Sequence, residues 1–138
     1  MSLYDTNLDK NKANYVPLTP LTFLKRAKEI YPNYEALIYE DRKFTWDQVY
    51  KRTVKFASAL NKIGVGKGDT VSFLAFNTPE IFEGHYSVPM TGAVLNTINI
   101  RLDAKTIAYI LDHSEAKVLV VDRQLHVEVK KALTTLKK

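Results

Sequence analysis

Residues 70–80 read TVSFLAFNTPE, and this stretch decides the fold. The segment 70–76 is short and mostly apolar, which predicts a buried strand. A helix start follows directly, because Thr78 can cap it, Pro79 suits its first position and Glu80 is favoured by the helix dipole. A buried strand that passes straight into a helix is typical of a parallel α/β sheet.

The same strand-to-helix pattern repeats twice downstream. The run AVLNTI at 93–98 precedes a helix capped by Asp103, and KVLVV at 117–121 precedes a helix over 123–137. The three strands begin 23 and then 24 residues apart, which is about one crossover unit each. Their apolar residues do not alternate cleanly with polar ones, as in strands covered on both faces. Since crossovers between parallel strands are right-handed almost by rule, we predict a three-layer α/β fold with a parallel sheet.

The N-terminal part of the sequence predicts an irregular arm and a first helix. We expect residues 1–18 to form the arm and residues 19–138 to form the α/β part. Thr19 and Pro20 offer a cap and a first-turn proline for a helix that Pro32 ends.

A small β-hairpin and a second helix are predicted next. The stretch EALIYEDRKFT reads as two short strands joined by a turn at Asp41-Arg42. Thr45 and Gln48 then form a capping box, in which each satisfies a free backbone N–H of the helix start. One apolar stripe follows at helical spacing and is closed by Gly64.

Composition and charge exclude several function classes. The 138 residues carry a net charge of +5, but no aromatic residues are interleaved with the tightest lysine group, so we expect no nucleic-acid binding. No apolar stretch approaches the roughly 18 residues that a membrane span needs. The chain has no cysteine, which excludes disulfides and a cysteine nucleophile. Because the first residues are polar and not a signal peptide, and a cysteine-free chain suits a reducing compartment, we expect a cytoplasmic location.

The sequence offers no catalytic residue and no metal site that spacing alone can identify. The segment GVGKGD at 64–69 follows a predicted helix and opens a strand, whereas a dinucleotide-binding loop follows a strand and opens a helix. We interpret it as a helix stop and a turn. His85, His113 and His126 match no metal-binding spacing, and we expect structural roles for them.

Arg101 is the candidate for ligand binding. It follows the second predicted strand, at the carboxyl end of the sheet where ligands bind in parallel α/β folds. A guanidinium group is planar, permanently charged and multidentate, and it is therefore a preferred partner of phosphate. Asn96, Thr97 and Asn99 could donate or accept hydrogen bonds nearby. The alternative is a salt bridge from Arg101 to Asp103 or another surface acid, with the asparagines as turn formers.

Four stretches carry a resemblance to a known family: the predicted hairpin, ANYVPLTPLTFLKRA, FTWDQVYKRTVKFASALNKIGVGKGDTVSFLAFNTPE and VPMTGAVLNTINIRLDAKTIAYILDHSEAKVLVVD. Together they cover roughly residues 13–123. They resemble the N-terminal region of AMP-forming acyl-CoA synthetases, the adenylate-forming family that includes luciferases and nonribosomal peptide adenylation domains. The spellings ANYVPLTPLTFL and NTINIRLD are most similar to the branch acting on short- and medium-chain acids, which methylthioalkanoate-CoA ligases and plant acyl-activating enzymes also resemble.

The resemblance implies an ATP-dependent acid–thiol ligase. Such an enzyme joins a carboxylic acid, fatty or related, to AMP from Mg²⁺-bound ATP and then transfers the acyl group to CoA. The family's phosphate loop, acidic motif and C-terminal lysine lie downstream of the region that this chain resembles. We therefore expect an incomplete N-terminal portion that is inactive alone, binds no cofactor by itself, and has the remainder of the enzyme chain and a small carboxylic acid as partners.

The resemblance also implies a role for Arg101, since it stands in the Asn-Ile-Arg-Leu turn at 99–102. In some related CoA ligases the arginine of this turn lies near the CoA nucleotide phosphates. Family members are often dimers, so a homo-oligomer is expected. The alternative to a ligase portion is a stand-alone noncatalytic α/β module for binding or assembly. A sheet interrupted in mid-fold should leave an unpaired edge and an uncovered apolar face.

Overall fold

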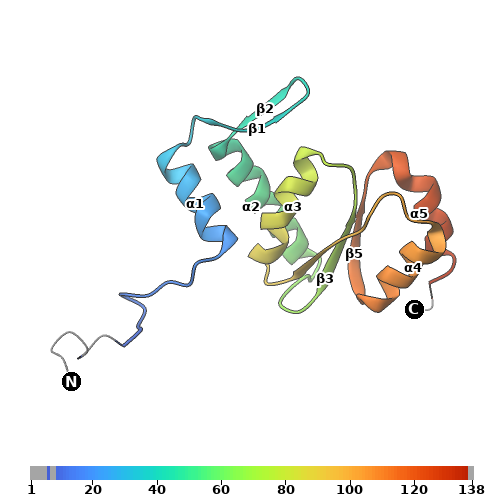
Figure 1. Cartoon of the computed structure of the whole chain (residues 1–138). Coiled ribbons are helices and arrows are strands. Elements are labelled where there is room, and N and C mark those ends of the chain that lie inside the picture. The colour runs from blue at the N-terminus through green and yellow to red at the C-terminus, as the bar shows by residue number, and fades with distance from the viewer. Residues whose placement is uncertain (1–5, 7–8, 137–138) are drawn as a thin grey trace.

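A three-stranded parallel sheet lies at the centre of the molecule. The computed structural model describes residue 6 and residues 9–136 of the chain (Figure 1). The strand order is β4-β3-β5, and both outer strands run parallel to β3. The strands span Thr70–Leu74 (β3), Val94–Thr97 (β4) and Ala116–Val121 (β5). The predicted parallel sheet is confirmed, although β3 ends two residues before the apolar run does.

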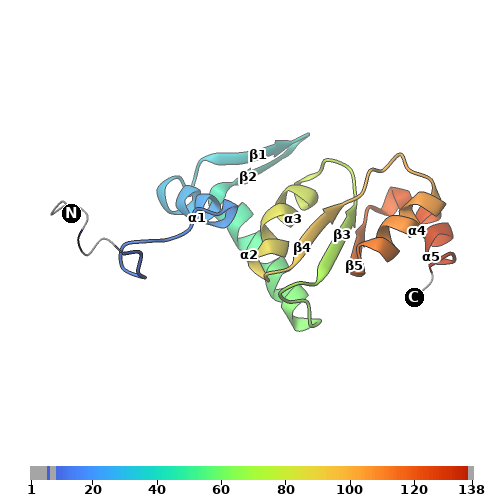
Figure 2. The ribbon, with the colours of Figure 1, turned by 60° about the horizontal axis from the view of Figure 1, so that its bottom comes forward.

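Helices cover both faces of this sheet and form the outer two of three layers (Figure 2). One face is covered by α2 (Trp46–Lys62) and α3 (Pro79–Met90). The other face is covered by α4 (Ala104–His113) and α5 (His126–Leu133).

The segment after β5 departs from the single helix predicted over 123–137. Arg123–Leu125 form a 3-10 turn (η2), and α5 follows it. The side chain of Asp122 accepts the N–H of Gln124 at 3.0 Å. Such a local side-chain bond competes with regular α-helical pairing, and apolar spacing alone does not reveal it.

One helix and a hairpin precede α2. They are α1 (Pro20–Ile30), β1 (Glu35–Tyr39) and β2 (Arg42–Thr45). Residues 9–18 contain neither helix nor strand and lead away from the body of the molecule in Figure 1.

The two helix starts in this region carry reciprocal caps. The Thr19 hydroxyl accepts the N–H of Thr22 at 3.4 Å, and the Thr45 hydroxyl accepts the N–H of Gln48 at 3.3 Å. In each case the second side chain bonds back to the cap residue's own N–H. The predicted capping box at Thr45 is confirmed, and both boxes satisfy donors that a helix start leaves unpaired.

The hairpin turn lies one residue earlier than predicted. Tyr39 pairs with Arg42, so the turn consists of Glu40 and Asp41, and its assignment to Asp41-Arg42 is wrong. Glu40 adopts a left-handed backbone with φ of 51°. Two-residue hairpin loops favour positive φ because it matches the strand twist, and a glutamate gives no sequence signal for that conformation.

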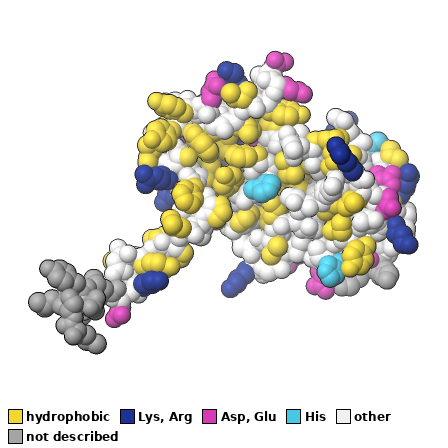
Figure 3. Space-filling view, in the orientation of Figure 1, with side chains coloured by type: hydrophobic (Ala, Val, Ile, Leu, Met, Phe, Trp, Pro, Cys, Tyr) yellow, Lys and Arg dark blue, Asp and Glu magenta, His cyan; other side chains and the backbone are white. Residues whose placement is uncertain are grey.

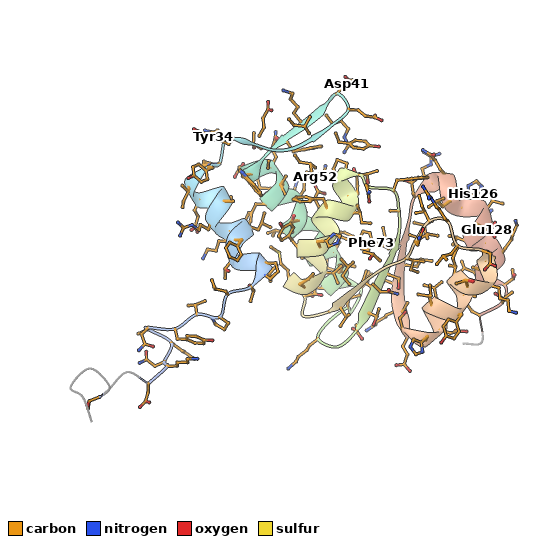
Figure 4. All side chains as sticks on the ribbon, in the orientation of Figure 1. Tyr34, Asp41, Arg52, Phe73, His126 and Glu128 are labelled. Atoms are coloured by element: carbon orange, nitrogen blue, oxygen red, sulfur yellow. The ribbon has the colours of Figure 1, made fainter. Side chains whose placement is uncertain are left out.

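β3 is buried on both faces and joins two cores. Val71 and Phe73 belong to the core beneath α2 and α3, whereas Leu74 belongs to the core beneath α4 and α5. Phe73, labelled in Figure 4, is 1% exposed, and its ring meets that of Phe56 edge-on with 6.0 Å between centroids. Burial on both faces, as predicted from the sequence, therefore explains why this strand is almost continuously apolar.

Gly84 on α3 makes room for the Phe73 ring. A Cβ at this position would lie 2.8 Å from Cζ of Phe73, closer than real Cβ contacts allow. A glycine inside a helix costs about 1 kcal/mol relative to alanine. The close packing of α3 on β3 explains why the sequence bears that cost.

We expect Gly84→Ala to destabilise the protein by about 1–2 kcal/mol, because core overpacking outweighs the gain in helix propensity. Urea unfolding measures this change. Gly66→Ala is the matched control, since a Cβ there meets no atom within 4 Å, and it should leave stability unchanged or slightly raised. Equal effects of the two substitutions would contradict the role assigned to Phe73.

Candidate functional site

The carboxyl edge of the sheet carries two hollows where the strands pass into loops. The first, of about 410 Å³, lies at the ends of β3 and β4 and is lined by Ala75, Phe76, Asn77, Ile81, Thr97, Ile98, Asn99 and Ile100. The second, of about 870 Å³, lies between the ends of β3 and β5 and the hairpin, with Tyr39, Arg42, Thr78, Glu80, Asp122 and Arg123 among its lining. Ligands bind at this edge in open parallel α/β sheets.

Asn96 is a structural residue of the sheet rather than an open ligand-binding group. Its side-chain amide donates to the Ser72 hydroxyl at 3.0 Å and to the Ser114 hydroxyl at 3.2 Å. Ser72 is fully buried in β3, and Ser114 ends α4. Asn96 therefore links β4 to β3 and to α4. Its amide nitrogen is used in these two bonds and does not point into the hollow.

Asn99 shapes the turn that carries Arg101. Its side-chain oxygen accepts the Arg101 N–H at 2.9 Å, and its carbonyl accepts the N–H of Leu102 at 3.4 Å. Asn99 is therefore a turn former, which was one of the two roles considered for the asparagines from the sequence.

Arg101 is exposed on the loop between β4 and α4. No ion pair within the described part of the chain involves it. Asp103 instead caps α4, with Oδ1 accepting the Thr106 N–H at 2.7 Å, and hydrogen bonds from Thr106 lower the pKa of Asp103. The alternative of a salt bridge between Arg101 and Asp103 is thus wrong for this structure, and the guanidinium faces solvent.

Two arginines and two glutamates form a clamp, of which Arg42 and Glu80 line the second hollow. Nη2 of Arg42 lies 2.7 Å from Oε1 of Glu80, and Arg52 binds the carboxylate of the buried Glu83 through both Nε and Nη2. Both guanidinium groups stack over the Phe44 ring, at 5.1 and 4.9 Å from its centroid. The clamp (Arg42, Arg52, Glu80 and Glu83; Arg52 is labelled in Figure 4) therefore joins β2, α2 and α3.

The pKa values of Arg52 and Glu80 are shifted within this clamp. The hydrogen bonds that Arg52 donates to the Glu83 carboxylate raise the pKa of Arg52 despite partial burial. Burial opposes ionisation of Glu80, but the hydrogen bond from Arg42 helps to outweigh it and the pKa of Glu80 is lowered. The sequence analysis missed this clamp, because its members come from three elements and share no periodicity.

The glycine-rich segment 64–69 lies at the opposite, amino edge of the sheet. Gly64 ends α2 with a φ of 82°. Asp69 accepts the N–H of Gly66 at 2.8 Å and is bonded by Nζ of Lys117 at 2.9 Å. These bonds, first from Lys117 and then from Gly66, lower the pKa of Asp69. The prediction of a helix stop and turn is confirmed.

The histidines lie on separate elements. Nδ1 of His85 and of His126 each lies within 2.9 Å of a backbone carbonyl three or four residues earlier, and the His113 ring stacks on Tyr109. Among the described residues, no group of three or more His, Cys, Asp or Glu could hold a metal ion. In the same part of the chain, no helix combines the length and the apolar character that crossing a bilayer requires.

Hydrophobic side chains gather on the face shown in Figure 3, over α1, the hairpin and α3. The exposed members include Phe23, Tyr34 and Ile38, which is 61% exposed. An apolar hollow of about 500 Å³ lies between the hairpin and α3. Patches of this kind mark surfaces that pack against other protein or ligand.

The fold is an open parallel α/β sheet with hollows at its carboxyl edge. Comparison with known proteins gives the family. A family model described as AMP-binding enzyme matches residues 24–138. This chain belongs to the AMP-binding enzyme family, and the resemblance seen in its sequence is confirmed.

Individual relatives agree with this assignment. The chain is 54% identical over 129 residues to a peroxisomal trans-cinnamate:CoA ligase of Petunia hybrida, covering 94% of this chain and 23% of the relative. It is 57% identical over 116 residues to a peroxisomal butyrate–CoA ligase of Arabidopsis thaliana, covering 84% and 20%. A crystal structure of an anthranilate CoA ligase in complex with anthranoyl-AMP aligns with a TM-score of 0.81 at 26% identity, covering 85% and 23%. The chain thus spans about a fifth of the length of its curated relatives.

The expectation of a cytoplasmic location is wrong, because both of these plant relatives are named as peroxisomal. The polar first residues on which that expectation rested do not distinguish the cytoplasm from the peroxisome. Peroxisomal proteins are addressed by short receptor-read signals such as Ser-Lys-Leu, which leave no mark on composition or on cysteine usage.

We expect Asn96→Ala to lower the stability of the protein by about 1–3 kcal/mol, because buried Ser72 loses its hydrogen-bond partner. Thermal or urea unfolding measures this loss. Asn99→Ala is the matched control, since Asn99 is exposed and its side chain supports only the turn, so its cost should be clearly smaller. A stable Asn96→Ala variant would contradict the structural role.

Proposed function

We propose that this chain is part of an ATP-dependent acid–thiol ligase, an AMP-forming acyl-CoA synthetase. The observation that carries the proposal is the family match over residues 24–138 together with CoA ligases at 54% and 57% identity. In this reaction a carboxylate attacks the α-phosphate of ATP, forming acyl-AMP and releasing pyrophosphate. The thiol of CoA then attacks the acyl carbon and displaces AMP. A stand-alone noncatalytic module is not favoured by any of these matches.

The described residues do not fit the ATP-handling part of that reaction. The glycine-rich segment 64–69 forms a turn between a helix and a strand, so no helix N-terminus receives a phosphate there. The described residues also provide no group of three or more His, Cys, Asp or Glu that could hold Mg²⁺. Adenylate formation is therefore assigned to the remainder of the enzyme chain, and this portion alone is expected to be inactive.

Within the complete enzyme, we assign Arg101 to the phosphate groups of CoA. Arg101 is exposed and forms no ion pair with any residue that the structure describes, and the Asn99 side chain holds the turn that presents it. A permanently charged, multidentate donor at the carboxyl edge of a parallel sheet suits a phosphate. The loop lies beyond the end of β4, so a ligand can reach Arg101 without disturbing either hydrophobic core.

The acid is proposed to be a small carboxylic acid, since the relatives are named for cinnamate and butyrate. A peroxisomal location is proposed from the same two names. Homo-oligomerisation stays a prediction.

The test uses a chimaeric ligase, in which this chain replaces the matching segment of the Petunia hybrida trans-cinnamate:CoA ligase. We expect the chimaera to form an acyl-CoA from ATP, CoA and cinnamate. A folded chimaera without ligase activity would contradict the proposed function.

In this chimaera, Arg101→Ala should raise the KM for CoA about tenfold, because a charge-assisted hydrogen bond is worth about 1.5–3 kcal/mol. Adenylate formation, followed by pyrophosphate exchange without CoA, should stay nearly unchanged. Arg101→Lys should retain part of the CoA affinity, since it keeps the charge but loses the planar fork. Arg26→Ala, which removes an exposed arginine on α1 that lines neither hollow, is the control and should leave the KM for CoA unchanged. An unaltered KM for CoA in Arg101→Ala would remove the assignment.

A further inference from the structure

The loop that carries Arg101 is held by a glutamate on a different helix. Oε1 of Glu128 in α5, labelled in Figure 4, accepts the N–H of Ala104, the first residue of α4, at 3.0 Å. We infer that Glu128 is a positioning residue for Arg101, because it fixes the place where the loop between β4 and α4 ends. The inference rests on the proposed function in that it takes the Arg101 guanidinium to bind a phosphate group of CoA.

The loop is fixed at its start by the sheet. The N–H of Ile98, directly after β4, donates to the carbonyl of Phe73 in β3 at 2.8 Å. Ile98 is buried in the core beneath α4 and α5, and Ile100 and Leu102 pack against the same core. Exposed residues alternate with these three, and Arg101 is one of them. The outward direction of Arg101 therefore depends on how this short segment lies on the core.

The end of the loop depends on Glu128, because the bonds within the turn do not reach another element. Asn99 accepts the N–H of Arg101 with its side chain and the N–H of Leu102 with its carbonyl. Asp103 caps α4 from the residue directly before it. The Glu128 carboxylate instead holds the start of α4 against α5.

Ordinary helix capping does not account for Glu128. Asp103 already accepts an N–H of the first turn of α4, with Oδ1 2.7 Å from the nitrogen of Thr106. Glu128 lies 24 residues beyond Ala104 and satisfies a second N–H of the same turn. Its other oxygen, Oε2, accepts a hydrogen bond from Nζ of Lys131 at 3.0 Å. Because both carboxylate oxygens have partners, the carboxylate keeps the loop end at a fixed place on α5.

The same arrangement leaves phosphate binding at this loop to Arg101. A helix N-terminus normally attracts anions, because its first N–H groups are unpaired and its dipole is positive there. At α4 the N–H groups of Ala104 and Thr106 already bind carboxylates, so a phosphate would meet two negative charges. Arg101 is exposed and forms no ion pair with any described residue. Since a group held in place loses less freedom on binding, Glu128 contributes to CoA affinity through Arg101.

Residue-resolved amide exchange in the chimaera tests the coupling between α5 and the loop. Glu128→Ala should speed exchange of the Arg101 and Leu102 N–H groups about tenfold, because the loop end is released. Glu128→Gln should keep both near their original rates, since its side-chain oxygen still accepts the Ala104 N–H. Glu29→Ala is the matched control, because Glu29 also pairs with a lysine of its own helix but lies on α1. Unchanged exchange of Arg101 and Leu102 in a folded Glu128→Ala chimaera would overturn the inference.

Kinetics of the same variants test whether this coupling reaches CoA. Glu128→Ala should raise the KM for CoA about threefold, because a less rigid Arg101 loses more freedom when phosphate binds. Adenylate formation, followed by pyrophosphate exchange without CoA, should not change. Glu128→Gln should restore most of the affinity, and Glu29→Ala should leave the KM unaltered.

A double-mutant cycle shows whether Glu128 acts through Arg101. In the Arg101→Ala background, Glu128→Ala should have no further effect on the KM for CoA, because the group that it positions is absent. Where Arg101→Ala itself raises the KM, two results would overturn the inference. One is an unaltered KM in Glu128→Ala, and the other is an equal increase in both backgrounds.

The inference and the proposed function fail separately. If Arg101→Ala leaves the KM for CoA unaltered while Glu128→Ala still speeds Arg101 exchange, the CoA assignment is lost and the positioning by Glu128 is retained. If Arg101→Ala raises the KM but Glu128→Ala changes neither exchange nor KM, the assignment is retained and the positioning is lost. A folded chimaera without ligase activity contradicts the proposed function, and the exchange rates then decide the inference alone.

Discussion

The burial of β3 on both faces is the constraint on which the rest of the structure depends. A strand without access to water must pair its N–H and C=O groups on both sides, and β4 and β5 meet this need with parallel ladders. Its side chains then require cover above and below. α2 and α3 provide it around Phe73, and α4 and α5 provide it around Leu74. The close fit of Phe73 against Gly84 sets how near α3 approaches the sheet.

Parallel pairing also separates the two ends of the sheet into different roles. At the amino edge, Asp69 and Lys117 close the turn that leads into β3. At the carboxyl edge, the loops after all three strands remain open and border two hollows. Asn96 binds inward and stabilises this edge, so the loop beyond it can present Arg101 to solvent without loosening the sheet.

The described residues form a parallel α/β scaffold with Arg101 exposed at its carboxyl edge, but the glycine-rich segment 64–69 provides no helix N-terminus for a phosphate. This division agrees with a chain that spans about a fifth of the length of its curated relatives. The apolar face over α1, the hairpin and α3 is a surface of the kind that packs against other protein or ligand. The peroxisomal names of two relatives correct the cytoplasmic location drawn from composition.

The sequence by itself determined the strand order along the chain, the helix starts at Thr45 and Asp103, and the family, because caps and apolar periodicity are local properties. The turn at Glu40 and the 3-10 turn after β5 were not predicted from the sequence. The first follows from strand twist and the second from one side-chain hydrogen bond of Asp122. Only the tertiary structure decided that Asn96 points inward, that Arg101 has no acidic partner among the described residues, and that two arginines clamp α3. Each of these depends on residues far apart in the chain, and their separation in space is set by how the helices pack on the sheet.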